Sequence, residues 1–189
     1  MARALPSPAD DPRLVEVRIA PMRRRHLRGV IRIEQQVYPR PWTFSLFLSE
    51  IGQRANRLYV VARVGSEVVG YAGLFKAVDD GHVTTVAVDP AWQRHGIATR
   101  MLLALARGAI DRGCTNLTLE VRMSNSGAQA LYQRFGFVPA GVRKGYYPET
   151  REDALVMWAH DVDSAGYAAR LADIERGVPG HTVVEGDWI

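Results

Sequence analysis

The sequence has a single cysteine and no apolar segment long enough to cross a bilayer. A lone Cys114 excludes an internal disulfide, and it excludes the several thiolates of a zinc ribbon or an iron–sulfur cluster. The apolar runs stay far below the ~20 residues that a transmembrane helix needs. Near the start of the chain, Pro6 interrupts the sequence before the apolar core of a secretory signal can form. We therefore expect a reducing compartment, the cytoplasm, and no membrane partner.

Signatures of a metal site are also missing. The five histidines include no pair at i, i+4 spacing, the spacing that lets one helix face bind a metal. Cys114 follows Gly113 at the expected end of a helix and has no histidine beside it in the sequence, which favours a buried, inert thiol over a nucleophile. We expect no metal and no acyl-cysteine intermediate.

The charge of the chain is divided unevenly. Residues 161–189 contain two basic and six acidic residues, a net charge of −4, whereas residues 1–160 carry +8. With 47% hydrophobic and 23% charged residues, the composition is that of an ordinary globular protein of about one domain. We predict a flexible N-terminal segment at 1–13, a folded domain at 14–160 and an acidic C-terminal extension at 161–189. A basic body favours an anionic partner.

The densest basic run lies at Met22–Arg28. It lacks the interleaved aromatic residues and the helix-turn-helix or zinc-finger spacing typical of nucleic-acid binding. Its period fits the solvated face of an amphipathic helix that would bury Leu27, Val30, Ile31 and Val37. We favour the solvated face, and direct nucleic-acid binding is not expected.

The hydrophobic pattern predicts an α/β fold with a mixed sheet. After a strand at 15–19 we expect a helix from Pro21, and then a short helix that Thr43 caps and that buries Phe44, Phe47, Leu48 and Ile51. An antiparallel meander follows, and the later alternation of strands and helices implies at least one parallel pair. The further strands are expected at 58–64, 68–78, 82–88, 117–122, 137–142 and 154–160, and the further helices at 98–112 and 128–135. For the C-terminal extension two alternatives stay open: a short helix at 165–175, or a segment that shields the basic body.

A strand, a short loop and a helix succeed one another between Val86 and Arg100. The backbone N–H groups at the start of such a helix point forward at the positive end of its dipole and can bind an anion. Gly96 lets the backbone approach a ligand closely, and the small Ala98 leaves room for a phosphate. An ordinary strand–helix turn would explain the same residues. The lysine and second glycine of a Walker loop are absent, as is the glycine pair of a dinucleotide fingerprint.

Several motifs together resemble those of the GNAT family of N-acetyltransferases, and within it the RimI-type ribosomal-protein-alanine N-acetyltransferases. Gln93–Ala98 is similar to the Gln/Arg-x-x-Gly-x-Gly/Ala signature that wraps the pyrophosphate of acetyl-CoA in that family. The likeness spans about residues 17–158 and leaves the C-terminal extension unexplained. The other matching segments are Ile33–Gln35, Pro41–Trp42, Leu119–Arg122, Ser124–Asn125, Ala130–Tyr132, Gly136–Phe137, Arg143, Tyr146–Pro148 and Glu152–Ala154.

The resemblance implies the acyl-CoA N-acyltransferase fold, in which a mostly antiparallel sheet contains a splayed, parallel central pair of strands. Acetyl-CoA, the implied co-substrate, would enter between the strand of Val86–Val88 and the strand of Glu120. The resemblance implies cofactor-binding roles for Val86, Ala87, Val88, Arg94, His95, Gly96, Ile97, Ala98, Thr99 and Asn125.

Acyl transfer from a thioester requires a neutral amine and a proton donor for the departing thiolate. The resemblance implies that Glu120 is the base and Tyr132 the acid. From the residues alone, Glu120 could be an arginine-paired strand residue, and Tyr132 could simply pack beside Leu131 and Phe135. Asn125 fits both an N-cap and a contact with the pantetheine arm.

The acceptor implied by the resemblance is the N-terminal alanine of a small-subunit ribosomal protein, with Trp42, Tyr146 and Tyr147 flanking the peptide. An α-amine has a pKa near 7.7–8.0, so a carboxylate base suits it better than a lysine with a pKa near 10.4. The basic body should repel a basic ribosomal protein, and we therefore assign that charge to the coenzyme phosphates. Acids at Glu34, Glu149, Glu152 or Asp153 are expected to make the acceptor site locally acidic.

Alternative functions stay open at this level. A sister enzyme could acetylate a lysine or a small-molecule amine, because fold and cofactor do not fix the acceptor. A non-catalytic module could bind coenzyme A, or RNA through Arg23–Arg25. If Met1 is removed, the chain begins with Ala2-Arg3, which resembles the family's substrate and makes self-acetylation conceivable.

Overall fold

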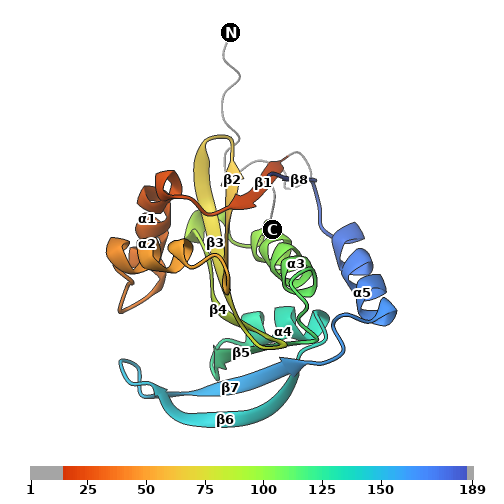
Figure 1. Ribbon diagram of the computed structural model, residues 1–189. Helices are drawn as coiled ribbons and strands as arrows, with labels where there is room; N and C mark the ends of the chain where they lie inside the picture. The colour runs from red at the N-terminus through yellow and green to blue at the C-terminus, as the bar shows by residue number, and fades with distance from the viewer. Residues whose placement is uncertain (1–14, 187–189) are drawn as a thin grey trace.

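A computed structural model describes residues 15–186 of the chain. One sheet of eight strands, in the order β6-β7-β5-β4-β3-β2-β1-β8, crosses the whole molecule (Figure 1). The expected segment 1–13 and the possible substrate Ala2 lie outside the described residues. The strands are β1 (Glu16–Pro21), β2 (Arg57–Val64), β3 (Glu67–Ala77), β4 (Asp80–Val88), β5 (Asn116–Arg122), β6 (Val138–Tyr147), β7 (Glu152–Ala159) and β8 (His181–Val184). The α-helices are α1 (Leu27–Val37), α2 (Phe44–Gly52), α3 (Ile97–Ile110), α4 (Ser126–Arg134) and α5 (Ala165–Arg176), with short 3-10 helices at Arg24–His26 and Pro90–Trp92.

The sheet is mixed, as the sequence predicts. β2, β3 and β4 form an antiparallel meander, and β5, β7 and β6 pair antiparallel in turn. Gly65, with a φ of 58°, makes the tight turn between β2 and β3. Two neighbouring pairs, β4 with β5 and β1 with β8, run parallel.

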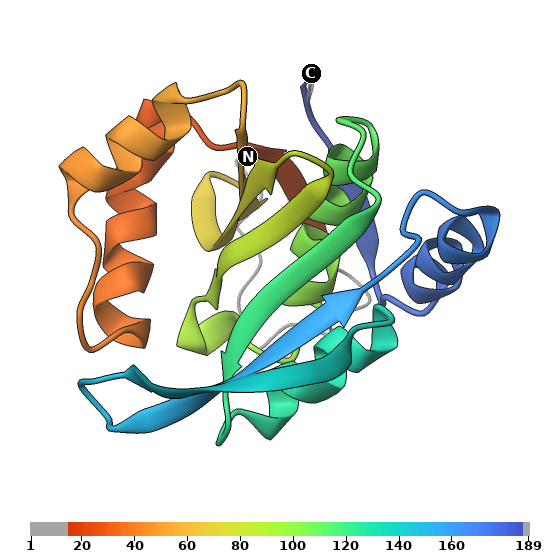
Figure 2. The same cartoon turned by 60° about the horizontal axis from the view of Figure 1, so that its bottom comes forward.

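Helices cover both faces of the sheet. Helices α1 and α2 lie on one side of the meander and α3 on the other (Figures 1 and 2). Helix α3 is apolar nearly all round because it packs against β2, β3 and β4 and is then covered by α5. A second cluster of buried residues joins α1 and Phe47 to the other face of β2 and β3.

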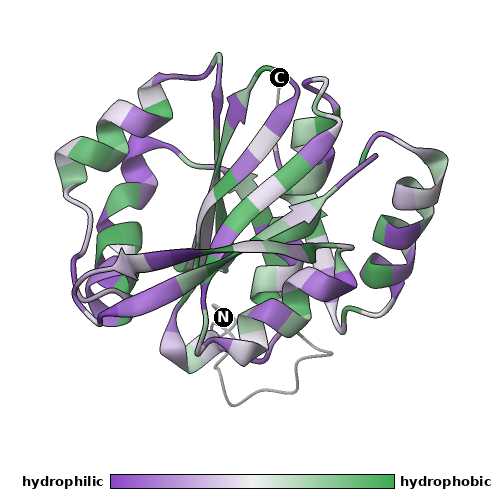
Figure 3. Ribbon diagram, turned by 90° about the horizontal axis from the view of Figure 1, so that it is seen from below, coloured by the Kyte–Doolittle hydropathy of each residue, from purple (hydrophilic) through white to green (hydrophobic). Residues whose placement is uncertain are grey.

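The first two helices differ from the prediction in their buried faces. Thr43 caps α2 as expected, and its hydroxyl accepts from the Leu46 N–H at 3.2 Å. Of the four apolar residues expected to be buried, only Phe47 is; Phe44 and Leu48 are 43% and 39% exposed, although Figure 3 colours much of α2 as hydrophobic. In α1 the buried stripe consists of Leu27, Val30, Ile33 and Glu34, whereas Ile31 and Val37 are only partly buried.

The C-terminal extension is part of the folded structure. The helix at 165–175 is confirmed as α5, and Ser164 caps it. The strands predicted from the sequence end with the one at 154–160, and this is wrong, because a further strand, β8, pairs with β1 at the sheet edge. Glu185 then contacts Arg18 at 2.8 Å and Arg63 at 2.6 Å. A domain boundary at residue 160 stays a prediction.

The central parallel pair separates part of the way along. β4 pairs with β5 only from Asp80 to Val83, opposite Asn116 to Leu119. Beyond that point β5 still pairs with β7 up to Arg122, and β4 still pairs with β3 up to Val88. The two strands therefore part between Thr84 and Val88, and Figure 2 allows this separation to be followed.

Candidate active site

A cavity of about 490 Å³ lies where β4 and β5 part. Strand residues form its floor, the segment between α1 and α2 contributes one wall, and the β6–β7 hairpin contributes the other. The lining residues are Glu34, Tyr38, Pro39, Arg40, Trp42, Glu50, Arg57, His82, Val83, Thr84, Thr85, Val86, Leu119, Glu120, Val121, Arg122, Asn125, Tyr132, Tyr146, Tyr147 and Glu149. The cavity thus brings together both predicted catalytic residues and all three predicted acceptor-binding aromatics.

Glu120 presents its carboxylate to this cavity. Its strand neighbours Leu119 and Val121 are buried in the core, so the alternation of the strand turns Glu120 to the other face. The Glu120 side chain is only 6% exposed, and Oε2 lies 3.0 Å from His82 Nε2 while Oε1 lies 3.1 Å from Arg143 Nη2. Each carboxylate oxygen therefore has one side-chain nitrogen beside it and keeps a further lone pair for a water or an amine.

Tyr132 reaches the same cavity from α4. Burial raises the pKa of the Tyr132 phenol, and the neighbouring Tyr38 and Tyr147 raise it further. The phenol therefore keeps its proton at neutral pH and can act as a hydrogen-bond donor. Its ring centroid lies 5.9 Å from that of Phe137, so the side chain also packs in the core. Tyr132 can therefore pack its ring in the core and still line the cavity with its hydroxyl end.

Tyr38 was not singled out from the sequence, yet it lies at the edge of β4 that faces the gap. Its hydroxyl donates to the Val86 carbonyl at 3.2 Å and lies 3.3 Å from Thr85 Oγ1. Val86 lines the cavity, whereas Ala87 is buried against α1 and Val88 lies further along the strand. Only the first of these three predicted cofactor residues therefore belongs to the described cavity lining.

The predicted phosphate loop follows β4 directly. The Asp89 side chain accepts from the Ala91 N–H at 3.0 Å and opens the 3-10 turn that leads into the loop. Arg94 and Gly96 both adopt left-handed backbone conformations, with φ of 67° and 70°. Helix α3 then begins at Ile97, with its first N–H groups free of helical partners and facing the loop.

The loop and the cavity lie at different places along β4. None of the six residues Arg94, His95, Gly96, Ile97, Ala98 and Thr99 is among the described residues that line the cavity. β4 connects the two places, because it runs from the cavity at Val86 to the loop that starts after Asp89. An extended ligand lying along β4 can therefore contact both.

Asn125 is both a helix cap and a cavity residue. Its side-chain oxygen accepts from the Ala128 N–H at 3.1 Å, and the residue also lines the cavity. The two interpretations of this asparagine are thus compatible in the structure.

The aromatic residues expected at the acceptor site face the cavity from opposite walls. Trp42 donates its backbone N–H to Glu34 Oε1 at 2.8 Å, and its ring lies 5.3 Å from that of Phe47. Tyr146 and Tyr147 lie edge to face on the other wall, with ring centroids 5.1 Å apart. Burial raises the pKa of Tyr147 to about 12.

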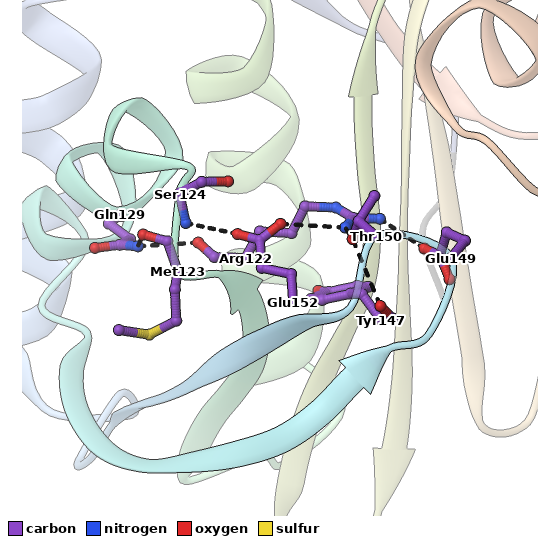
Figure 4. A network of polar contacts seen from close by, with 8 residues as sticks. All are labelled: Arg122, Met123, Ser124, Gln129, Tyr147, Glu149, Thr150 and Glu152. Atoms are coloured by element: carbon purple, nitrogen blue, oxygen red, sulfur yellow. Dashed lines mark hydrogen bonds and ion pairs between the residues drawn. The ribbon is translucent and has the colours of Figure 1, made fainter.

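Arg122 holds the wall that carries these tyrosines (Figure 4). Its guanidinium donates to Glu149 Oε1 at 2.7 Å and to Thr150 Oγ1 at 2.5 Å, and it lies 3.9 Å from the Tyr147 ring centroid. Glu152 adds a contact of 3.4 Å to the same guanidinium and accepts from the Ser124 N–H. Arg122 was missed as a site residue because its partners, 27–30 residues away in the chain, come together only when β5 and β7 pair.

Two of the four acids expected at the acceptor site line the cavity, namely Glu34 and Glu149. Burial raises the pKa of Glu34, and the Tyr71 hydroxyl donates to its second oxygen. The other two do not line it: Glu152 pairs with Arg122, and Asp153 pairs with Lys144 at 2.8 Å. Since Arg40, Arg57 and Arg122 also line the cavity, its charge is mixed rather than simply acidic.

The remaining sequence predictions concern metals, cysteine and membranes. Within residues 15–186, no group of three or more His, Cys, Asp or Glu side chains is placed to hold a metal. Cys114 is fully buried, as expected, and burial raises the pKa of its thiol. None of the described helices has the length and apolar character needed to span a bilayer.

Comparison with known proteins defines the class. The [ribosomal protein bS18]-alanine N-acetyltransferase of Escherichia coli (strain K12) is 35% identical over 133 residues, which cover 69% of this chain and 88% of the relative. The crystal structure of the E. coli ribosomal-protein-S18-alanine N-acetyltransferase superposes with a TM-score of 0.70 at 33% identity, covering 77% of this chain and 94% of that one. The fold is also that of an N-acetyltransferase from Thermoplasma acidophilum in complex with coenzyme A, with a TM-score of 0.63 at 16% identity, covering 76% and 98% of the two chains.

The fold and the parted strands define an acyl-CoA N-acyltransferase. The model of the acetyltransferase (GNAT) family matches residues 27–137, more than half of the chain. The chain belongs to the GNAT family of acetyltransferases, as its motifs predict, and it is an acyltransferase.

Proposed function

We propose that this protein transfers the acetyl group of acetyl-CoA to the N-terminal α-amine of a protein, with the alanine of a small-subunit ribosomal protein as its acceptor. The observation that carries the proposal is that Glu120 and Tyr132 line one cavity at the point where β4 and β5 part. The bS18-alanine activity named for the E. coli relatives supports the choice of acceptor.

The residues of the chain fit both the diphosphate and the pantetheine arm of acetyl-CoA. The loop Gln93–Gly96 and the first N–H groups of α3 offer backbone donors to the diphosphate, in two left-handed turns that bring the backbone forward. The pantetheine arm would lie along the unpaired edge of β4 at Val86 and pass Asn125 into the cavity. The T. acidophilum protein of the same fold is in complex with coenzyme A, which supports the choice of this ligand.

The transfer would proceed directly within a ternary complex. Glu120, directly or through a water, accepts a proton from the α-ammonium group, and the neutral amine attacks the thioester carbonyl carbon. A C–N bond forms and the C–S bond breaks. The Tyr132 hydroxyl donates a hydrogen bond to the sulfur as negative charge develops there. The attacking nitrogen loses its second proton as the amide forms, and that proton passes through the Tyr132 hydroxyl or water to the thiolate, which leaves as coenzyme A. Holding both substrates in one cavity supplies much of the rate.

The chemistry of the base favours an α-amine over lysine. At pH 7.5 about a third of an α-amine is neutral, compared with about a thousandth of a lysine side chain. A carboxylate is a weak base, so an amine that is already partly neutral is the better matched substrate.

A peptide panel tests this function. Peptides that start with alanine, peptides with an internal lysine and blocked N-terminus, and polyamines are incubated with acetyl-CoA, and the acetylated nitrogen is located by mass spectrometry. We expect acetylation at the α-nitrogen of the alanine peptide. Turnover of lysine or polyamine alone would favour a sister enzyme, and salt-sensitive RNA binding without thiol release would favour a binding module.

Self-acetylation at Ala2 is tested separately. Intact-mass measurement compares the wild type with Glu120→Gln, and identical N-terminal acetylation of the two proteins would exclude it.

A further inference from the structure

A buried arginine joins the predicted phosphate loop to the C-terminal extension. Arg100, in the first turn of α3, is 2% exposed. Its Nη1 donates to the His95 carbonyl at 2.9 Å, its Nε donates to Thr182 Oγ1 at 2.8 Å, and its Nη2 donates to the Pro179 carbonyl. One guanidinium thus contacts the loop on one side and the segment that leads into β8 on the other.

The loop rests directly on this guanidinium. A Cβ placed at Gly96 would lie 2.8 Å from Arg100 Nη1 and 3.1 Å from Val178 Cγ1. Glycine is required here both by this close approach and by its φ of 70°. The backbone turn at Gly96 is therefore packed against both Arg100 and the C-terminal segment.

The C-terminal segment is itself firmly anchored by contacts outside the loop. The Arg107 guanidinium pairs with both oxygens of Glu175, at 2.8 and 2.7 Å. β8 follows β1 in register for four residues. The pairing of β8 with β1 fixes the positions that Arg100 contacts, because Thr182 lies within β8, opposite Val17, and Pro179 lies two residues before the strand. The Arg107–Glu175 pair is exposed, at 42% and 49%, and contributes little to their placement.

Arg100 brings a positive charge to this position, and none of its hydrogen-bond acceptors among residues 15–186 is a carboxylate. Its three acceptors are two carbonyls and a hydroxyl. Burial lowers the pKa of Arg100 to about 10, so the group is still positively charged at neutral pH. A fixed positive charge immediately behind the loop complements a diphosphate in front of it.

We propose that Arg100 is a positioning residue for the coenzyme, and that the C-terminal extension supports the coenzyme site through it. Arg100 fixes the His95 carbonyl and the turn at Gly96 before the ligand arrives, so that binding does not have to order the loop. The inference rests on the proposed function, in which this loop binds the diphosphate of acetyl-CoA.

Two variants test the role of Arg100. Arg100→Lys keeps the charge and removes the forked contacts, and Thr182→Val removes only one acceptor from the anchor side. Titration calorimetry with coenzyme A gives Kd, and steady-state assays give kcat and the KM of each substrate. We expect Arg100→Lys to raise the Kd about tenfold, equivalent to ~1.4 kcal/mol, and Thr182→Val to raise it about threefold. We expect kcat and the peptide KM to stay within about twofold of wild type.

The matched control is Glu175→Gln, which breaks the ion pair with Arg107 on the same segment without touching the loop. Its Kd should equal that of the wild type, and melting temperatures identify any variant that fails to fold. The inference is overturned if Thr182→Val and Arg100→Lys fold and bind coenzyme A like the wild type. It is also overturned if Glu175→Gln weakens binding as much as Thr182→Val does. Wild-type protein that takes up no coenzyme A would instead refute the proposed function itself.

Discussion

Replacing Glu120 by glutamine should remove the base and leave the fold intact. The amide keeps the size of the carboxylate, and the Glu120 side chain is only 6% exposed, so the shape of the cavity is retained. Loss of a general base typically lowers the rate by 10²–10⁴-fold. Because a water can still accept the proton of an amine that is about a third neutral, we expect the lower part of that range, about 100- to 1,000-fold in kcat, or ~2.7–4 kcal/mol.

Stability should change little in the same variant. Arg143, one of the two partners of Glu120, is 58% exposed, and the loss of such a pair costs only ~0–1 kcal/mol. Thiol release from acetyl-CoA with an alanine-starting peptide gives kcat, and calorimetry gives the coenzyme Kd, which should stay within about twofold. Glu67→Gln is the control, because this exposed carboxylate contacts only Arg32 among the ion pairs of the described chain. A folded Glu120→Gln enzyme with kcat within about threefold of wild type would refute the role of Glu120 as base.

Two other predictions concern residues of the cavity, and a third concerns the buried His26 outside it. Tyr132→Phe keeps the ring packed on Phe137 and removes the hydroxyl, so kcat should fall about 10- to 100-fold with little change in melting temperature; an unchanged kcat would contradict the role of Tyr132 as acid. Arg122→Lys loses the forked contact that holds the β6–β7 hairpin, so the peptide KM should rise about three- to tenfold while the acetyl-CoA KM stays the same, as steady-state kinetics would show. Burial lowers the pKa of His26 to about 4, and its Nδ1 accepts from the Arg23 N–H at 3.1 Å. The His26 imidazole therefore binds a proton more tightly in the unfolded chain than in the folded one. The contribution of His26 to the free energy of unfolding is fully present above pH ~6.5 and falls by up to ~3 kcal/mol toward pH 4. Urea denaturation should show a weaker pH dependence for His26→Gln than for the wild type, and an equal dependence would contradict the low pKa of His26.

Local sequence patterns were sufficient for the meander and for the central helix. Nearly continuous apolar runs on either side of the Gly65 turn predict β2 and β3, and the long apolar stretch after Gly96 predicts α3. These are short-range signals that do not depend on the rest of the chain. The apolar face of β5 and the placement of Glu120 on the opposite face follow from the two-residue period of a strand.

The features that the sequence did not predict depend on contacts between segments far apart in the chain. β8 has only four residues and is stabilised by β1, about 165 residues earlier in the chain, so its own pattern is too short to identify a strand. Helix α2 has apolar residues on more faces than the sheet can cover, which explains the exposure of Phe44.

The same limit applies to the residues that complete the candidate site. Tyr38 contacts Val86 at the place where β4 and β5 part, and His82 on β4 reaches Glu120 on the neighbouring strand β5. Arg100 lies on a buried side of the mostly apolar helix α3, and its contacts form only when the C-terminal segment packs against that helix.

The parallel pairing of β8 with β1 also has a consequence for solubility. A strand at the border of a sheet exposes a row of unsatisfied N–H and C=O groups, which can recruit the border strand of another molecule. β8 satisfies these groups on β1 and leaves only a short border of its own. A chain shortened before His181 would uncover β1, and we expect such a protein to self-associate through edge-to-edge contacts even where its core remains folded.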